Sequence, residues 1–456
     1  MRVIRILAAL GLSGAAGSVG LALEVGFGEV DITPKVGGEK KVWLAGYGTG
    51  RAATGVHDPL MARCVVLKDG EEKIALVSVD LVGLQYQEVE AVRKELQGFS
   101  YVLISSTHNH EGPDVVGIWG KTPFHHGVDH AYLAGVVERL VNLVKETGER
   151  VVDGLEGSFG TAEDETLLKD SRLPKAFDPV LRVLVFTKTE SGDRAGVLVQ
   201  WNSHPESLGS KNTTITADFP WATVEALKVR YQCPVVYFTG AVGGLMAPPV
   251  GPSTFEYAEE HGKEVAALAG QAIESAKPVS LTPMKVKATK VYIPVTNKLY
   301  RVAKSMGVLK RGGFLWTGDG FKRGEPMAKE NAAQTMAVET EVTCLHLGDL
   351  LVAGVPGELY PELVYGSFQE PADAAADFPE AKLEPTVVGM VGEKKWMLFG
   401  LANDEVGYLI PKRQWDRKKP FAYGKKKSQY GEANACGPEA AGIVMEGLRR
   451  CVKVGD

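Results

Sequence analysis

Metal-ligating side chains stand directly after several apolar runs of the sequence. Two of the nine histidines form the segment His108-Asn109-His110, and His204 and Glu358 follow two further runs. Residues i and i+2 face the same side of a strand, so we expect His108 and His110 to approach one metal ion or one substrate. Taken singly, each residue has an ordinary alternative: a histidine that caps a turn, a structural histidine before proline, or a carboxylate at a helix N-terminus.

The elements that must position these residues alternate between strands and helices. Short apolar runs predict buried strands at 74–79, 101–104, 197–201, 235–238, 350–355 and 396–401. Amphipathic patterns predict helices over 87–96, 131–145, 220–231, 257–276 and 438–452. This alternation indicates an α/β fold, a layered sandwich of mixed β-sheet with flanking helices. Ligands bind beyond the carboxyl ends of strands in such folds, so we expect one sheet edge to gather the polar residues into a metal site.

The composition is that of a globular protein large enough for a substantial core. Of 456 residues, 45% are apolar and 23% are charged, and the formal net charge of −5 argues against a nucleic-acid partner. The five cysteines show no CxxC spacing, which favours buried thiols, with room for one disulfide, over a metal cluster.

The N-terminus has the pattern of a secretory signal. Arg2 and Arg5 precede an apolar stretch and then small residues, which predicts a signal peptide over 1–22 and a secreted or periplasmic protein. An uncleaved membrane anchor is the alternative, but glycines and serines weaken it. We expect 25–456 to form one domain, with the glycine-rich, basic stretch 285–340 as an insertion or long loop.

Four segments resemble the neutral ceramidase family, and the resemblance covers most of 25–450. They are 26–34 (GFGEVDITP), 44–48 (LAGYG), 55–60 (GVHDPL) and 107–113 (THNHEGP). The resemblance implies a Zn²⁺ cofactor held by His108, His204, Glu358 and Tyr408, a ligand set that suits zinc. It also implies that His110 handles the proton of the attacking water and that Tyr430 donates to the oxyanion. Arg172 matches a family arginine that contacts the substrate.

Carboxylates often hold metal-bound histidines from behind, and Asp80 and Asp218 are the candidates for this role here. A solvated or capping role is the alternative for both aspartates.

The chain departs from the family in two places. The family's active-site serine would fall at or near Met246, and the stretch 239–248 contains no serine. The sequence also shows no counterpart of the family's C-terminal immunoglobulin-like domain. These departures put ceramide in doubt as the substrate, while the predicted zinc site stays complete.

A basic run, 412–427, separates Tyr408 from Tyr430 and contains eight basic residues and one acid. It is either a solvated loop or a rim that contacts an anionic substrate or the membrane surface.

The sequence as a whole predicts an exported zinc-dependent hydrolase that cleaves the amide bond of an N-acyl lipid-like or other small-molecule substrate. Two alternatives stay open: a non-catalytic zinc-containing binding protein on the same scaffold, and a zinc ester or phosphoester hydrolase. The oligomeric state is not fixed by the sequence.

Overall fold

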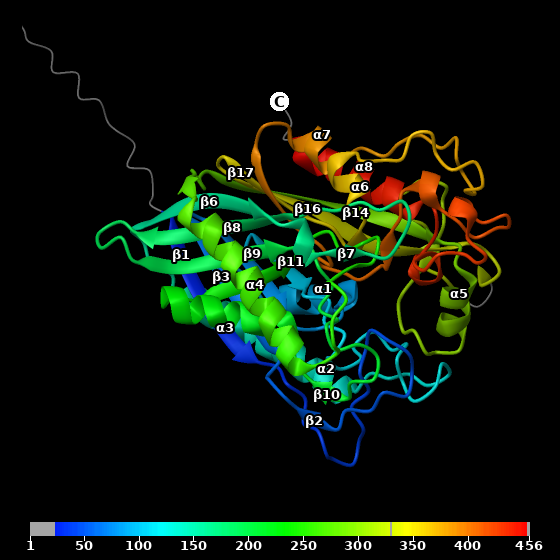
Figure 1. Ribbon diagram of the computed structural model, residues 1–456, viewed down its shortest axis with the longest axis horizontal. Helices are drawn as coiled ribbons and strands as arrows, with labels where there is room; N and C mark the ends of the chain where they lie inside the picture. Colours follow the sequence, from blue (N-terminus) through cyan, green and yellow to red (C-terminus); the bar gives the residue numbers. More distant parts are fainter. Residues whose placement is uncertain (1–22, 329–330, 454–456) are drawn as a thin grey trace, which may run out of the picture.

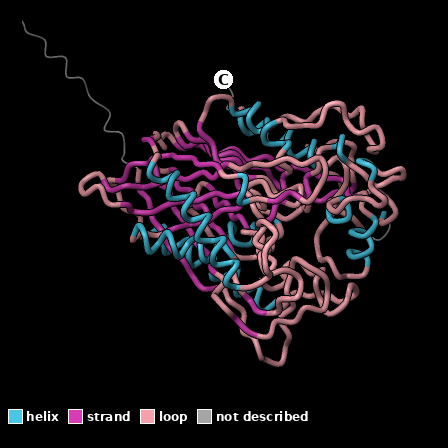
Figure 2. Tube along the Cα trace, viewed as in Figure 1, coloured by secondary structure: helices cyan, strands magenta, loops and turns pink. Residues whose placement is uncertain are grey.

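Three β-sheets surround a shared apolar core, and helices cover their outer faces (Figure 1). The structure is a computed structural model that describes residues 23–328 and 331–453, so the predicted signal peptide lies outside the described residues. Figure 2 shows the strands running side by side through the middle of the molecule, with loops gathered toward one side.

The first sheet has four strands, and the chain leaves its last strand toward the histidine pair. In spatial order they are β1 (Glu24–Asp31), β3 (Met61–Asp69), β4 (Glu72–Val79) and β5 (Tyr101–Ser106). Only the β4–β5 pair is parallel. Helices α1 (Tyr86–Lys94) and α2 (His130–Glu149) pack on its outer face. The side chain of Asp129 accepts from the Ala131 N–H and so caps the start of α2.

The second sheet lies beside the first and is covered by α3 (Phe219–Tyr231) and α4 (Phe255–Glu274). Its order is β11 (Val235–Thr239), β9 (Arg194–Trp201), β8 (Val180–Lys188), β6 (Leu155–Glu163) and β13 (Lys277–Pro278). Figure 1 shows α4 crossing the outer face of this sheet. Strands β9 and β11 run parallel.

The third sheet is built from the C-terminal half of the chain. Its order is β14 (Met284–Val295), β16 (Met336–Leu347), β17 (Leu350–Gly354) and β19 (Lys395–Phe399), and β15 (Phe314–Leu315) also pairs with β16. Helices α6 (Glu362–Tyr365), α7 (Val387–Val391) and α8 (Ala440–Val452) pack on its outer face.

Short elements connect the sheets and build the site. Helix α5 (Lys298–Ser305) follows β14. The two-stranded pairs are β2 (Gly55–Val56) with β10 (Thr214–Ile215), β7 (Lys169–Asp170) with β12 (Met246–Ala247), and β18 (Glu358–Leu359) with β20 (Tyr408–Leu409).

The shared core explains why the central strands read as continuous apolar runs. Leu76 from the first sheet, Phe238 from the second and Phe399 from the third belong to one cluster of buried side chains. The rings of Phe238 and Phe399 stack with their centroids 4.0 Å apart. Strands that are buried on both faces need apolar residues at every position, so the period-two pattern disappears.

All six predicted strands and all five predicted helices are present, with ends that differ by a few residues. The structure differs from the expectation at the start of 285–340, where β14 is a twelve-residue strand. Its first seven residues include Lys285, Lys287 and Lys290 at a sheet edge, where lysine is common and hides the strand pattern.

All five cysteines are buried and free, which confirms the prediction of buried thiols. Across residues 23–328 and 331–453, no helix combines the length and the apolar character that a membrane span requires.

Candidate metal centre and its cavity

Three buried histidines, His108, His110 and His204, meet in the interior with ligand atoms within 4.8 Å of one another. The ring centroids of His108 and His204 are 4.8 Å apart, and His110 lies 4.9 Å from the first and 5.4 Å from the second. The expected position at the carboxyl ends of strands is confirmed, but the site draws on three sheets and not on the single sheet edge that we expected. His108 follows β5 of the first sheet, His204 follows β9 of the second, and Glu358 follows β17 of the third. The three sheets converge on a shared core, so three edges contribute.

A turn, and not strand geometry, brings His108 and His110 together. Strand β5 ends at Ser106, and His108 has φ 65°, a left-handed conformation that is uncommon for residues other than glycine. The i, i+2 argument of an extended strand therefore does not apply here. The local strain is of the kind that packed functional sites retain.

Backbone carbonyls fix the orientation of two of the rings. The Nδ1 of His108 lies 2.6 Å from the Val82 carbonyl oxygen, and the Nδ1 of His204 lies 2.6 Å from that of Met246. A carbonyl oxygen only accepts, so each Nδ1 donates and each Nε2 is the ring nitrogen left to bind a proton or a metal ion. Both Nε2 atoms face the Glu358 Oε2, at 3.5 Å from His108 and 3.0 Å from His204. The contact between Nδ1 and a carbonyl oxygen is typical of histidines that bind a metal through Nε2.

The two candidate aspartates have other roles. The Asp80 carboxylate pairs with the buried Arg63 guanidinium at 2.9 Å, and Asp218 caps α3 by accepting from the Phe219 N–H. The carbonyl contacts of Val82 and Met246 replace the carboxylates that we expected behind the histidines.

Glu358 and Tyr408 are paired in a two-residue parallel ladder, β18 with β20. The Glu358 N–H donates to the Gly407 carbonyl at 3.2 Å. Gly407 has φ 83°, and a side chain there would collide with the Asn434 carbonyl, so only glycine fits this approach. Further back, the Asn403 N–H and side-chain Oδ1 both bond to the backbone of Ile104 in β5, at 2.6 and 3.1 Å. The segment that carries Tyr408 is thereby tied to the strand that leads to His108.

The charges of the centre are tightly coupled. Burial opposes protonation of His108, but the nearby Glu358 carboxylate outweighs this and raises the pKa of His108 to about 9. Burial also acts on Glu358, yet the two histidines lower the pKa of its carboxyl group. For Tyr408, burial and then the Glu358 charge raise the pKa well above its ordinary value. The Glu358 carboxylate therefore favours a positive charge beside the Nε2 atoms, as a proton or as a metal ion.

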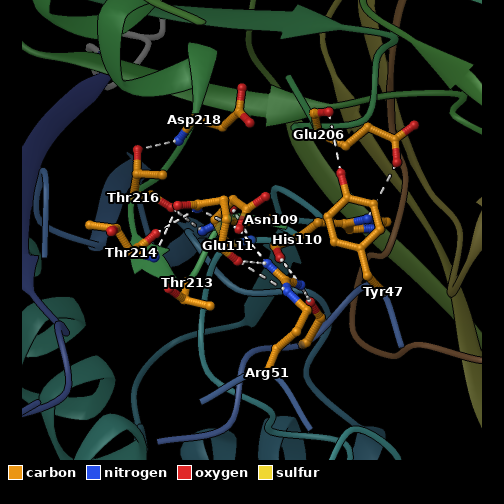
Figure 3. A network of polar contacts seen from close by, with 12 residues as sticks. Tyr47, Arg51, Asn109, His110, Glu111, Glu206, Thr213, Thr214, Thr216 and Asp218 are labelled. Carbon is orange, nitrogen blue, oxygen red and sulfur yellow. Dashed lines mark hydrogen bonds and ion pairs between the residues drawn. The ribbon is translucent and has the colours of Figure 1, made fainter. Parts of the chain in front are cut away.

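Figure 3 shows His110 within a network of polar side chains that includes Tyr47, Arg51 and Glu206. Its Nδ1 lies 3.5 Å from the Glu206 Oε2, and the Tyr47 ring packs edge-on against it at 5.1 Å. Arg51 donates to the His110 carbonyl at 3.1 Å and pairs with the buried Glu111 carboxylate. Burial, then the neighbouring imidazoles, lower the pKa of His110 well below its usual range. His110 is therefore neutral at neutral pH, and its Nδ1 has no hydrogen-bond partner among the described residues.

Tyr430 lines the cavity beside the centre, but Arg172 does not. The ring of Tyr430 lies edge-on to that of Tyr408, with centroids 5.9 Å apart. The buried Arg172 guanidinium instead pairs with Glu432 at 2.7 and 3.0 Å and donates to the Tyr430 carbonyl at 2.8 Å. These contacts tie Arg172 to the segment that carries Tyr430, and the substrate contact that the resemblance implied stays a prediction.

The centre opens into a cavity of about 510 Å³. His108, His110, Glu358, Tyr408 and Tyr430 contribute to its wall. Most of the remaining wall is apolar: Val116, Ile118, Trp119, Phe124, Leu299, Val302, Ala303, Met306, Val308, Leu309 and Val406. This combination of a polar centre and an apolar wall suits a ligand with a reactive polar bond and an apolar tail.

Two carboxylates near the centre could be singled out only from the structure: Glu405 lines the cavity, and Glu206 lies beside His110 without lining it. Glu206 stands two residues after His204, and Glu405 lies in the segment that leads to Tyr408. Burial, followed by the Glu358 charge, raises the pKa of Glu405 to about 8. The same i, i+2 spacing that drew attention to His108 and His110 relates His204 to Glu206, and it was the available signal.

Comparison with solved structures identifies the fold. A crystal structure of neutral ceramidase from Pseudomonas aeruginosa matches with a TM-score of 0.68 at 15% sequence identity, covering 95% of this chain and 74% of that one. A ceramidase complexed with C2 matches with the same TM-score and identity, covering 95% of this chain and 75% of that one. No protein-family model matches the sequence, and no curated protein matches it. The chain has the fold of the neutral ceramidases.

Proposed function

We propose that this protein is a zinc-dependent hydrolase that cleaves the amide bond of an N-acyl lipid-like substrate. One observation carries the proposal. Two histidines, each fixed by a carbonyl behind it, present Nε2 atoms to the Glu358 carboxylate on the wall of a largely apolar cavity. Such a centre has the donors of a hydrolytic metal site and the surroundings of a lipid-binding pocket.

The predicted ligands are His108, His204, Glu358 and Tyr408, and their chemistry fits zinc. Nitrogen and oxygen donors are the ligands that zinc accepts, and all four residues are buried. When bound there, zinc lowers the pKa of a water and polarises a carbonyl group. With the Glu358 carboxylate as its neighbour and no cation, Tyr408 is a neutral phenol. A nearby cation favours its phenolate form.

The neighbouring side chains supply the proton chemistry. His110 is neutral, so its Nε2 accepts the proton of the attacking water and then returns it to the leaving amine nitrogen. The Glu206 Oε2 lies 3.5 Å from the His110 Nδ1, close enough for its charge to favour a proton on that nitrogen. Tyr430 donates from its hydroxyl group to the oxygen of the scissile carbonyl as negative charge develops there.

The cavity supports an apolar substrate more than a phosphoester. Among the described residues that line it, none belongs to the basic run 412–427. Within that run, Lys412 pairs with Glu439 and Arg413 with Glu370. The Met246 backbone, at the place of the family serine, holds His204 through its carbonyl oxygen. The proposed attack needs no serine, and ceramide is one of several amides that the cavity can accept.

A substrate panel tests the proposed function. Purified, zinc-reconstituted protein is given fluorogenic N-acyl amides of different chain length, matching esters and a phosphoester, each with and without a chelator. The proposal predicts chelator-sensitive cleavage that is fastest for long-chain amides. Cleavage of phosphoesters alone would overturn the reaction class. Zinc binding without cleavage of any substrate would favour the alternative, a zinc-containing binding protein.

Export is part of the proposal and has its own test. The full chain is expressed in a bacterial host with a secretory pathway, and the N-terminus of the exported protein is sequenced. Export predicts a mature chain that begins near residues 16–24. Full-length protein found entirely in the cytosol would contradict this part of the proposal.

A further inference from the structure

Helix α5 has two apolar faces, one packed on the core and one exposed to solvent. Tyr300 and Ala303 pack against the core that the first sheet and α2 share, and this attachment holds the helix in place. Leu299, Val302 and Met306, at i, i+3 and i+7, share the outward face and are 60%, 52% and 49% exposed. No residue of α5 is fully buried. The helix therefore displays an apolar stripe that nothing in the described chain covers.

The loop between β5 and α2 extends this stripe through Phe124, which is 67% exposed. Phe124, Leu299, Val302 and Met306 also line the cavity of the metal centre. Together with Tyr430, they make up five of the twelve large apolar side chains that are exposed in the described residues. Exposed apolar side chains that stand alone are common, whereas a cluster at the mouth of a site marks an interaction surface.

Basic residues surround the apolar stripe. The segment 297–313 contains three lysines and two arginines and no acidic residue. Arg311 pairs with the buried Asp404, while Lys298 and Lys310 are exposed, as is Lys121 in the loop beside Phe124. Within the described residues, none of these three lysines pairs with a carboxylate. The rim thus combines exposed apolar side chains with free positive charge.

A basic helix with an exposed apolar face is the pattern of helices that lie in the interfacial region of anionic membranes. We propose that α5 and the Phe124 loop dock this protein on an anionic lipid bilayer, with the cavity mouth against the membrane. Apolar side chains enter the acyl boundary, and Lys121, Lys298 and Lys310 meet the lipid headgroups. This inference rests on the proposed function in one respect: docking is useful to the protein because it brings a lipid substrate to the cavity. The binding to lipid itself does not depend on hydrolysis.

The place of the stripe favours a bilayer over a protein partner. The same side chains form the outer wall of the cavity, so a folded protein seated on them would cover the mouth of the site. A lipid layer supplies apolar molecules at that mouth. The basic run 412–427 offers charge alone, because the large exposed apolar side chain nearest to it, Tyr430, lies outside the run.

Vesicle sedimentation tests the docking surface. The full-length protein is mixed with vesicles of phosphatidylcholine and phosphatidylserine, and separately with vesicles of phosphatidylcholine alone. We expect binding to the anionic vesicles that weakens as salt is added. The variant Leu299→Gln/Val302→Gln should bind about tenfold or more weakly, because two inserted apolar side chains are lost. The matched control, Val229→Gln/Val250→Gln, alters two side chains that are 73% and 80% exposed elsewhere and should bind like the wild type.

Two further variants separate docking from folding and from catalysis. Lys298→Glu leaves the apolar stripe intact and should weaken binding to anionic vesicles only. His204→Ala disrupts the proposed zinc centre and should still bind vesicles as the wild type does. Near-ultraviolet circular dichroism checks that each variant is folded.

Three results would overturn the docking proposal. The first is wild-type protein that ignores anionic vesicles, and the second is equal binding by the α5 variant. The third is a dimer that the α5 substitutions dissociate, which would assign the stripe to a second copy of the chain. A failure of hydrolysis with intact vesicle binding would count against the proposed function and leave docking standing.

Discussion

Glu358 and Tyr408 lie opposite each other in a parallel ladder only two residues long. The ladder joins the segment after β17 to the segment after β19, and it sets a carboxylate beside a buried phenol. Without a cation, this neighbour keeps the phenol protonated, because the pKa of Tyr408 is raised well above 10. The arrangement is unfavourable for an anionic phenol unless positive charge lies between the two side chains.

This relationship predicts a spectroscopic signature. Adding zinc to the metal-free protein at neutral pH should produce the near-ultraviolet absorbance change of tyrosine ionisation, since a bound cation favours the phenolate. The Tyr408→Phe variant should lack the change and bind zinc more weakly. Tyr430→Phe is the matched control and should keep the signal. A signal that survives in Tyr408→Phe would remove Tyr408 from the ligand set.

Glu206 should act as a positioning residue for His110. In Glu206→Gln, we expect kcat to fall about 10- to 100-fold, because the negative charge that favours a proton on the His110 Nδ1 is lost, while KM and zinc content change little. Glu206→Asp should recover part of the rate. Glu259→Gln, on the exposed side of α4, is the control. An equal fall in zinc content would show instead that Glu206 supports the metal site as a whole.

Arg172 should contribute mainly to the stability of the protein. It should affect activity only by holding the segment that carries Tyr430. Arg172→Met leaves the buried Glu432 carboxylate unpaired, which costs about 3–5 kcal/mol in the free energy of unfolding. The double variant Arg172→Met/Glu432→Met should lose less than the single one. Denaturant unfolding measures both values. A specific loss of substrate affinity in Arg172→Met, with stability intact, would support the substrate contact that the family resemblance implied.

Glu362 should make the stability of the protein depend on pH. Burial raises the pKa of its carboxyl group from 4.5 to about 7, although the Gln414 side chain donates to one of its oxygens. A raised carboxyl pKa means that the folded state holds a proton that the unfolded state releases. Its contribution to stability is therefore complete below pH 4.5 and is lost as the pH rises through 7, at about 1.4 kcal/mol per pH unit.

The Glu362→Gln variant provides the measurement. Its free energy of unfolding should lack this component, so the difference between wild type and variant should change between pH 5 and pH 7 by about 2 kcal/mol. The exposed Glu380→Gln is the control and should follow the wild type. Parallel pH curves for wild type and Glu362→Gln would mean that the carboxyl group is not protonated in the folded state.

Sequence patterns captured what depends on local order. Strands β4, β5, β9, β11, β17 and β19 are buried on both faces, so their apolar runs predicted them, along with the polar residues at their ends. The proposed ligands His108, His204 and Glu358 could be identified because each follows such a run, and Tyr408 only through the family resemblance. Strand β14 could not be predicted from the sequence, because lysines at the sheet edge interrupt its apolar pattern.

Contacts between distant segments were beyond the reach of the sequence. Nothing local indicates that Arg172 meets Glu432, or that backbone carbonyls, and not aspartates, hold His108 and His204. The wall that α5 contributes to the cavity was hidden for the same reason. Its side chains show their role only when the third sheet and the loop after β5 are brought together.

The most direct test of the zinc centre is the metal content of the purified protein and of His204→Ala, measured after reconstitution and dialysis. His125→Ala, at an exposed histidine outside the centre, is the control. We expect about one zinc per chain in the wild type and the control, and little in His204→Ala, with amide hydrolysis following the zinc content. Absence of zinc from the reconstituted wild type, or equal zinc in His204→Ala, would contradict the ligand set on which the proposed function stands.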